Sequence, residues 1–115
     1  MTDEHVDHET LSVLREVMEE GYPELLDTFL ADSRLRLDDL QVTVDAKALS
    51  DVAHSFKGSA SNMGAIRLAE LCRELEAEAK DKSATQIAQL IADIIGEFEF
   101  ISAVYEKERQ QALTH

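Results

Sequence analysis

Apolar residues recur every three or four positions along most of this chain, and the strict alternation typical of strands is nearly absent. The pattern predicts helices at about 8–19, 23–44, 46–63 and 65–80, and a last helix that starts near residue 84. The last helix carries its apolar residues at a spacing near 3.5, which is typical of bundle packing. We therefore expect an all-α fold, an antiparallel four-helix bundle with a short additional N-terminal helix.

The same periodicity assigns the buried face of each helix. In the first helix these are Leu11, Leu14 and Met18. In the second they are Leu26, Phe29, Leu30, Ser33, Leu37, Leu40 and Val44. In the last they are Ile87, Ile91, Ile94, Phe98, Ile101 and Tyr105. The single cysteine, Cys72, shares the apolar register of its helix, so we expect it to pack in the core.

Glycine and proline are scarce, with four and one in the chain, and most of them mark a helix end. Gly21 is expected to end the first helix as a C′ glycine, and Pro23 to begin the second. Gly64 ends the third helix. A capping box beginning at Ser83 opens the last one, and Gly96 within it is expected where a neighbouring helix comes close.

A length of 115 residues predicts one domain over residues 1–115, with 1–7 and 112–115 frayed. The net charge of −13 argues against nucleic acid as a partner, because binding phosphates needs a basic surface. One cysteine permits no intrachain disulfide. Neither a signal peptide nor a membrane-spanning run is apparent, so we expect a cytoplasmic protein, monomeric and without membrane contact.

One histidine of the third helix, His54, lies opposite its apolar stripe. It falls about 150° from the centre of that stripe on a helical wheel. Its neighbours on the wheel are small or polar: Ser50, Asp51, Lys57, Gly58 and Ser61. This histidine is therefore expected to face solvent in an open patch of the surface.

The residues that follow His54 suit a phosphoryl acceptor. Gly58, four positions later, costs about 1 kcal/mol within a helix but leaves space beside the imidazole. Lys57, three positions later, can place its ammonium over the same spot. A nucleophile, room for a bulky group and a balancing cation are what phosphoryl transfer to a side chain requires. The alternative is an ordinary solvated helix face with a tolerated glycine.

The run H-S-F-K-G-S-A-S-N-M-G-A, residues 54–65, resembles the signature of the histidine-containing phosphotransfer (HPt) domain family. The run L-A-E-L-C-R-E-L-E, residues 68–76, is similar to the next helix of that family. The helical layout extends the likeness across nearly the whole chain. The chain most resembles the stand-alone bacterial type, in which the domain is the entire protein.

The resemblance implies a carrier in a multistep two-component phosphorelay, without kinase activity of its own. His54 would accept a phosphoryl group from a receiver-domain aspartate and pass it to another receiver. The partners implied are receiver domains of hybrid sensor histidine kinases and of a response regulator. The protein would need no cofactor, since the partner receiver would hold Mg²⁺.

The resemblance also assigns roles around His54. Lys57 would offset phosphoryl charge, Gly58 would let the receiver approach, and Ser61 would orient the imidazole, unless it is an ordinary surface serine. The expected docking surface comprises Ser50, Asp51, Lys57, Gly58 and Ser61, with facing residues of the second and fourth helices.

The chain departs from the family at two positions of the fourth helix. Where some members have a glutamine and an arginine close to the histidine, this chain has Glu76 and Lys80. A carboxylate cannot donate a hydrogen bond as an amide does. Lys80 could still supply a cation; otherwise Lys57 carries this role alone.

Three other interpretations compete. A dimerising domain of a sensor kinase would carry Glu or Asp after the histidine and Thr or Asn at the fourth position, where this chain has Ser55 and Gly58. A helical adaptor that binds a regulator without being phosphorylated needs none of His54, Lys57 and Gly58, but fold alone does not exclude it. A metal site could use His5 and His8, although no further ligand is well placed.

Overall fold

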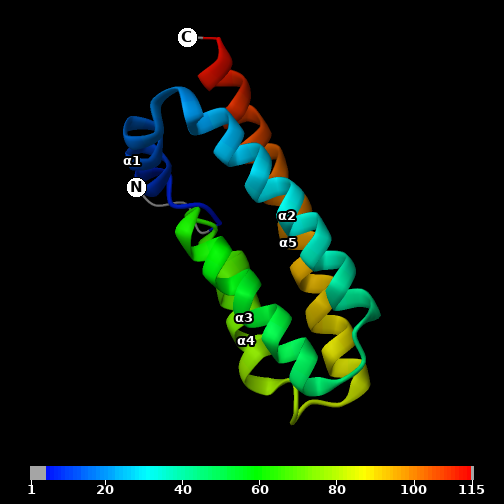
Figure 1. Ribbon diagram of the computed structural model, residues 1–115. Coiled ribbons are helices and arrows are strands. Elements are labelled where there is room, and N and C mark those ends of the chain that lie inside the picture. The colour runs from blue at the N-terminus through cyan, green and yellow to red at the C-terminus, as the bar shows by residue number, and fades with distance from the viewer. Residues whose placement is uncertain (1–4, 115) are drawn as a thin grey trace.

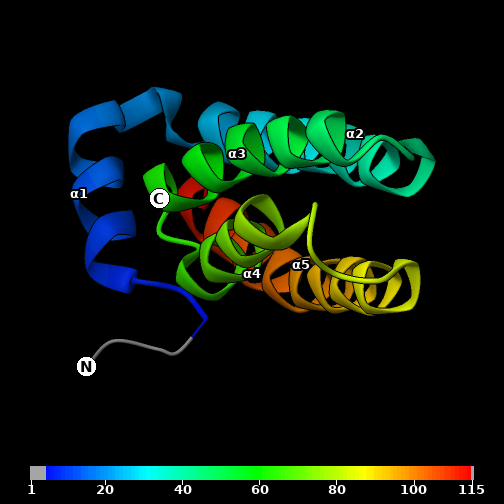
Figure 2. The ribbon, with the colours of Figure 1, turned by 90° about the horizontal axis from the view of Figure 1, so that it is seen from below.

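The computed structural model describes residues 5–114, and its helices are α1 (His8–Met18), α2 (Tyr22–Val42), α3 (Ala46–Asn62), α4 (Ile66–Glu78) and α5 (Ala84–Leu113). Helices α2 to α5 alternate in direction and form an antiparallel bundle, and α1 lies at the end of the bundle where a turn joins α3 to α4 (Figures 1 and 2). The predicted fold is confirmed. No helix in the described part of the chain is long and apolar enough to cross a bilayer.

The core is formed by the apolar faces that the periodicity predicts. Ile94, Ile101 and Tyr105 of α5 are fully buried, and Ile87 and Ile91 near its start are partly buried. Cys72 is also fully buried, and this burial raises the pKa of its thiol to about 12. The cysteine is therefore a packing residue.

The prediction of burial is wrong for two residues, Val44 and Met18. Val44 is 98 % exposed, because α2 ends at Val42 and Thr43 is extended, which takes Val44 out of the helical register. Met18 is 39 % exposed, because it is the last residue of α1 and borders the short 3₁₀ turn Glu19–Gly21. Both errors arise where a helix stops earlier than the periodic pattern does.

The helix ends follow the sequence signals in most cases. Pro23 lies in the first turn of α2. The capping box is present, with the Ser83 hydroxyl accepting from the Gln86 N–H and the Gln86 side chain accepting from the Ser83 N–H. Gly21 is the exception, because it has φ −81° and precedes α2, whereas Glu19 takes the positive φ of 49° that ends α1.

Residues 5–7, which were expected to be frayed, pack against the bundle. Val6 is fully buried, and the Asp7 N–H donates to the Gly64 carbonyl at 2.7 Å. His5 Nδ1 lies 2.8 Å and 2.9 Å from the two carboxylate oxygens of Glu97, and its ring lies 4.3 Å from that of Phe100. The N-terminal segment is thus tied to both α5 and the α3–α4 turn.

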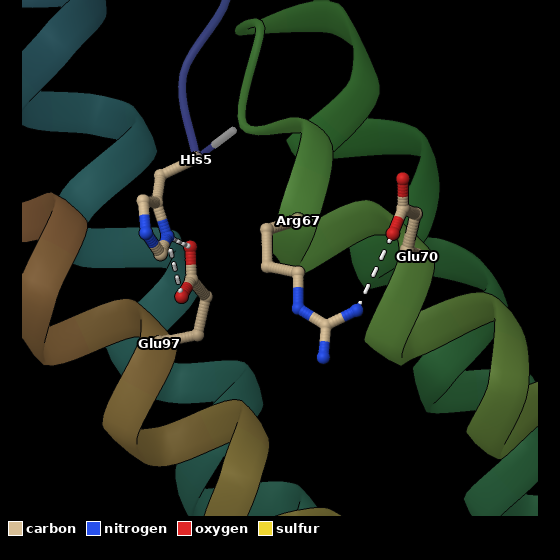
Figure 3. Close-up of polar contacts among 4 residues, drawn as sticks. All are labelled: His5, Arg67, Glu70 and Glu97. Carbon is tan, nitrogen blue, oxygen red and sulfur yellow. Dashed lines mark hydrogen bonds and ion pairs between the residues drawn. The ribbon is translucent and has the colours of Figure 1, made fainter. Parts of the chain in front are cut away.

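Figure 3 shows His5 reaching Glu97 on α5, while Arg67 turns to Glu70 along α4 at 3.3 Å. At the other end, α5 runs to Leu113, and the Thr114 N–H donates to the Gln111 carbonyl at 3.3 Å. The other residues expected to be frayed, 1–4 and 115, lie outside the described residues.

Two glycines differ sharply in their surroundings. Gly64 has φ +76°, and a Cβ there would lie 3.0 Å from the Asp7 carbonyl oxygen and 3.1 Å from Thr10 Cβ. Gly96 is exposed within α5, and no atom lies within 4 Å of where its Cβ would be. The expectation that a neighbouring helix approaches Gly96 is wrong.

These surroundings predict opposite effects of the same substitution. Gly64→Ala should lower the free energy of unfolding by about 1–2 kcal/mol, because it places a side chain in a left-handed conformation. Gly96→Ala should raise it by about 0.5–1 kcal/mol, because alanine favours the helix and meets no neighbour. Urea denaturation of both variants measures the difference. A neutral Gly64→Ala would mean that the α3–α4 turn is not constrained as described.

Candidate functional site

His54 lies in the middle of α3 on the face that points away from the core. Its side chain is 67 % exposed, whereas Ala53, Phe56 and Ala60 on the opposite face are fully buried. The solvent-facing orientation predicted from the wheel is confirmed. The imidazole is therefore accessible to a partner without any movement of the bundle.

A carboxylate from α4 holds the imidazole. Glu76 Oε2 lies 2.6 Å from His54 Nδ1, and Glu76 Oε1 accepts from Lys57 Nζ at 2.6 Å. The Ser50 hydroxyl donates to the Glu76 backbone carbonyl at 2.8 Å, which fixes the same turn of α4 against α3. Glu76 of α4 therefore forms hydrogen bonds with three residues of α3, namely Ser50, His54 and Lys57.

The contact with Glu76 determines which imidazole nitrogen can react. An ionised carboxylate only accepts hydrogen bonds, so His54 Nδ1 must be the nitrogen that carries the proton. In the neutral ring, Nε2 then keeps its lone pair and is the nucleophilic nitrogen. Glu76 thus selects the tautomer of His54 that can attack an electrophile through Nε2.

The same contacts keep Glu76 ionised. The hydrogen bond from Lys57, followed by the one from His54, lowers the pKa of the Glu76 carboxyl. The Lys57 side chain is 29 % exposed, so its ammonium borders both the carboxylate and solvent. The site thus joins Lys57, the Glu76 carboxylate and His54 in one hydrogen-bonded chain.

Gly58 provides the open space predicted beside the histidine. It is exposed one turn after His54, and no atom lies within 4 Å of where its Cβ would be. Any other residue at this position would place a side chain on the surface next to the imidazole. The glycine leaves this surface free for a partner to approach.

The structure does not join Ser61 to the imidazole. Ser61 is exposed two turns beyond His54 and makes no hydrogen bond to it among the described residues. The residue that contacts Nδ1 is Glu76, whose role beside His54 the sequence did not predict. Its partnership with His54 depends on how α3 and α4 are aligned, and the sequence pattern alone does not specify this alignment.

The remaining predicted surface residues surround the site without touching His54. Ser50 is partly buried against α4, and Asp51 is exposed and paired with Lys47 at 3.1 Å. Lys80 is exposed and forms no ion pair with Glu76 or any other described carboxylate. Lys57 is therefore the cation that contacts the Glu76–His54 pair.

Grooves lie on both sides of His54. The α2–α3 groove has a volume of about 500 Å³, and its lining includes Leu35, Arg36 and Ser55, with Arg36 donating to the Ser55 hydroxyl at 3.2 Å. The α3–α4 groove has a volume of about 310 Å³, and its lining includes Lys57, Ser61 and Arg73. His54 thus stands on a ridge of α3 between two shallow hollows.

The described residues do not support the alternative of a metal site. Within 5–114, no three His, Cys, Asp or Glu side chains come together in a way that could hold a metal ion. His5, one of the two candidate ligands, lies against Glu97 and Phe100 instead.

The family model of the Hpt domain matches residues 24–100, a segment that includes His54, Lys57, Gly58 and Glu76. The chain belongs to the Hpt-domain family. The match covers α3 and α4 and most of α2 and α5, which are the four helices of the bundle.

Solved structures agree with this assignment. Histidine-containing phosphotransfer protein B (HptB) from Pseudomonas aeruginosa PAO1 is 44 % identical to this Hpt-domain protein, with a TM-score of 0.88 over 93 % of this chain and 96 % of that one. A histidine-containing phosphotransfer protein from rice has a TM-score of 0.84 over 95 % of this chain and 82 % of that one. At 19 % identity the rice protein supports the fold alone. No match was found among the curated proteins.

The tautomer of His54 can be tested directly. We expect ¹⁵N–¹H correlation spectra of the neutral imidazole to show the Nδ1–H form in the wild type. In Glu76→Ala the Nε2–H form should gain population, because the acceptor at Nδ1 is gone. Glu74→Ala is the matched control, since Glu74 is exposed on the same helix and has no contact with His54. An unchanged tautomer ratio in Glu76→Ala would rule out the positioning role of the carboxylate.

Proposed function

We propose that this Hpt-domain protein carries a phosphoryl group on His54 between receiver domains in a phosphorelay. One observation carries the proposal: the exposed imidazole has its Nδ1 hydrogen-bonded to the Glu76 carboxylate, which leaves Nε2 as the nucleophile. Membership of the Hpt-domain family and 44 % identity to HptB support the same function.

The transfer follows from the arrangement of these groups. His54 Nε2 attacks the phosphorus of an aspartyl phosphate in line, so that an N–P bond forms as the P–O bond to the aspartate breaks. The electron pair of that bond leaves with the aspartate carboxylate. The imidazole gains positive charge as the N–P bond forms, and the adjacent Glu76 carboxylate stabilises this charge. The reverse sequence passes the group to another receiver.

Lys57 acts on the phosphoryl oxygens. Its ammonium lies at the edge of the site, bound to Glu76 Oε1 and partly exposed. When a phosphoryl group occupies Nε2, the ammonium can turn from the carboxylate to the nearest phosphoryl oxygen. The Mg²⁺ that neutralises the remaining charge belongs to the receiver, and this protein requires no cofactor of its own.

The protein in this proposal is a carrier and not a kinase, since the energy for transfer comes from the partner's aspartyl phosphate. The partners are receiver domains of hybrid sensor histidine kinases and of a response regulator. A monomeric state is supported by the bundle itself, because helices α2 to α5 of one chain complete it. This distinguishes the chain from two-helix domains that must dimerise.

The phosphoacceptor can be tested without any partner. Phosphoramidate should place an acid-labile, base-stable phosphoryl group on His54, located by mass spectrometry. His54→Gln should abolish it, with helicity and thermal stability preserved because the side chain is exposed. His8→Gln is the matched control, since His8 is also exposed. If His54 of the folded protein stays unmodified, the non-phosphorylated adaptor becomes the better interpretation.

The role of Lys57 predicts a partial loss. Lys57→Ala should slow phosphorylation of His54 by about tenfold or more, because a hydrogen bond between charged groups contributes about 1.5–3 kcal/mol. Some transfer should remain, since the nucleophile is intact. Lys47→Ala removes an exposed lysine of the same helix and should leave the rate unchanged. A wild-type rate for Lys57→Ala would remove Lys57 from the site.

A further inference from the structure

We propose that the α2–α3 groove beside His54 binds an apolar side chain of the partner receiver that is surrounded by lysine or arginine residues. This inference rests on the proposed function and adds the chemistry by which this chain selects among receivers. It depends on the charges that line the groove, of which Asp51 belongs to the docking surface expected from the sequence and Asp32 and Asp39 do not.

The α2–α3 groove is lined by both apolar and acidic side chains. Its apolar lining consists of Leu35, which is 63 % exposed, and the partly buried Val52. The carboxylates of Asp32, Asp39 and Asp51 line the same groove, and all three residues are exposed. Leu35 and Val52 together offer an apolar contact in this groove, and the surrounding carboxylates favour a basic partner.

These charges are only partly compensated within the described chain. Asp51 is paired with Lys47, but Asp32 and Asp39 form no ion pair or side-chain hydrogen bond with any described residue. The guanidinium in the groove, Arg36, donates to the Ser55 hydroxyl instead of to a carboxylate. The groove therefore keeps a negative potential that cations of a partner can neutralise.

The position of the groove places it under any receiver that reaches His54. Ser55, the next residue, and Asp51, one turn earlier, both line it. A specific interface covers about 800 Å² on each partner, which corresponds to a patch with a radius of about 16 Å. One helical turn is about 5.4 Å. A receiver whose aspartate meets Nε2 must therefore cover the groove.

The groove on the other side of His54 has one uncompensated cation. Lys57 and Arg73 line this α3–α4 groove; Lys57 is paired with Glu76, whereas Arg73 forms no ion pair with any described residue. The acidic residue of that groove, Glu70, is paired with Arg67. A fitting receiver presents basic residues toward α2 and acidic residues toward α4, so the charge pattern also sets its orientation.

A second copy of this chain suits the α2–α3 groove less well. Each copy carries a net charge of −13, so two copies repel each other at long range. A receiver with a basic patch is attracted instead. Its association with this chain is faster, and salt reduces this acceleration by screening the charges.

The test compares two neighbouring aspartates of α2. Protein phosphorylated on His54 with phosphoramidate is mixed with purified receiver domains of the source organism, and the receiver with the fastest transfer is retained. Asp39→Lys should lower its second-order transfer rate constant by about tenfold at low salt. Asp38→Lys makes the same change of charge at an exposed position outside the groove and should change the rate less than twofold. The difference should shrink at 0.5 M salt.

The apolar lining is tested in the same assay. Leu35→Gln should slow transfer at both low and high salt, whereas Val42→Gln should not. Val42 is 75 % exposed on the same helix but does not line the groove. Circular dichroism verifies that all four variants are folded.

Three results would overturn the inference: equal effects of Asp39→Lys and Asp38→Lys, no effect of Asp39→Lys, or faster transfer by it. A dimer of the wild type that Asp39→Lys dissociates, seen by sedimentation, would place a second copy in the groove and also overturn it. These results are distinct from failure of the proposed function, which would appear as absence of phosphoryl groups on wild-type His54.

Discussion

The close pairing of α3 with α4 is the constraint on which the site depends. Ala53 and Ala60 are fully buried on the inner face of α3, and such small side chains let two helices approach closely. The sharp turn at Gly64 connects the two helices in antiparallel order. Only with this alignment does a carboxylate from α4 lie 2.6 Å from His54. A shift of one turn, about 5.4 Å, would separate them.

Much of the fold could be predicted from the sequence, because local signals and apolar periodicity agree along most of the chain. His54 could be placed on the exposed face for the same reason, since its position follows from neighbours in one helix. The failures lie at helix ends, where Val44 leaves the helical register and Glu19 takes the conformation expected of Gly21. The exact residue at which a helix ends depends on which local turn conformation is most stable, and the spacing of apolar residues does not predict this.

The role of Glu76 could not be predicted because it depends on alignment between two helices. From the sequence, Glu76 is only a carboxylate of the fourth helix that cannot donate a hydrogen bond as an amide does. In the structure, one carboxylate oxygen of Glu76 accepts a hydrogen bond from Lys57 and the other accepts one from His54. Glu76 therefore accepts the hydrogen bond of His54 and places a carboxylate beside the nucleophile, held there by Lys57.

The burial of Cys72 has a consequence for the chemistry of signalling under oxidising conditions. Oxidants and alkylating reagents attack the thiolate, and burial raises the pKa of this thiol to about 12, so almost none is ionised near neutral pH. The chain has no other cysteine. A cysteine introduced on the surface would thus be its sole reactive thiol, and a fluorophore attached there would report partner docking from one known position.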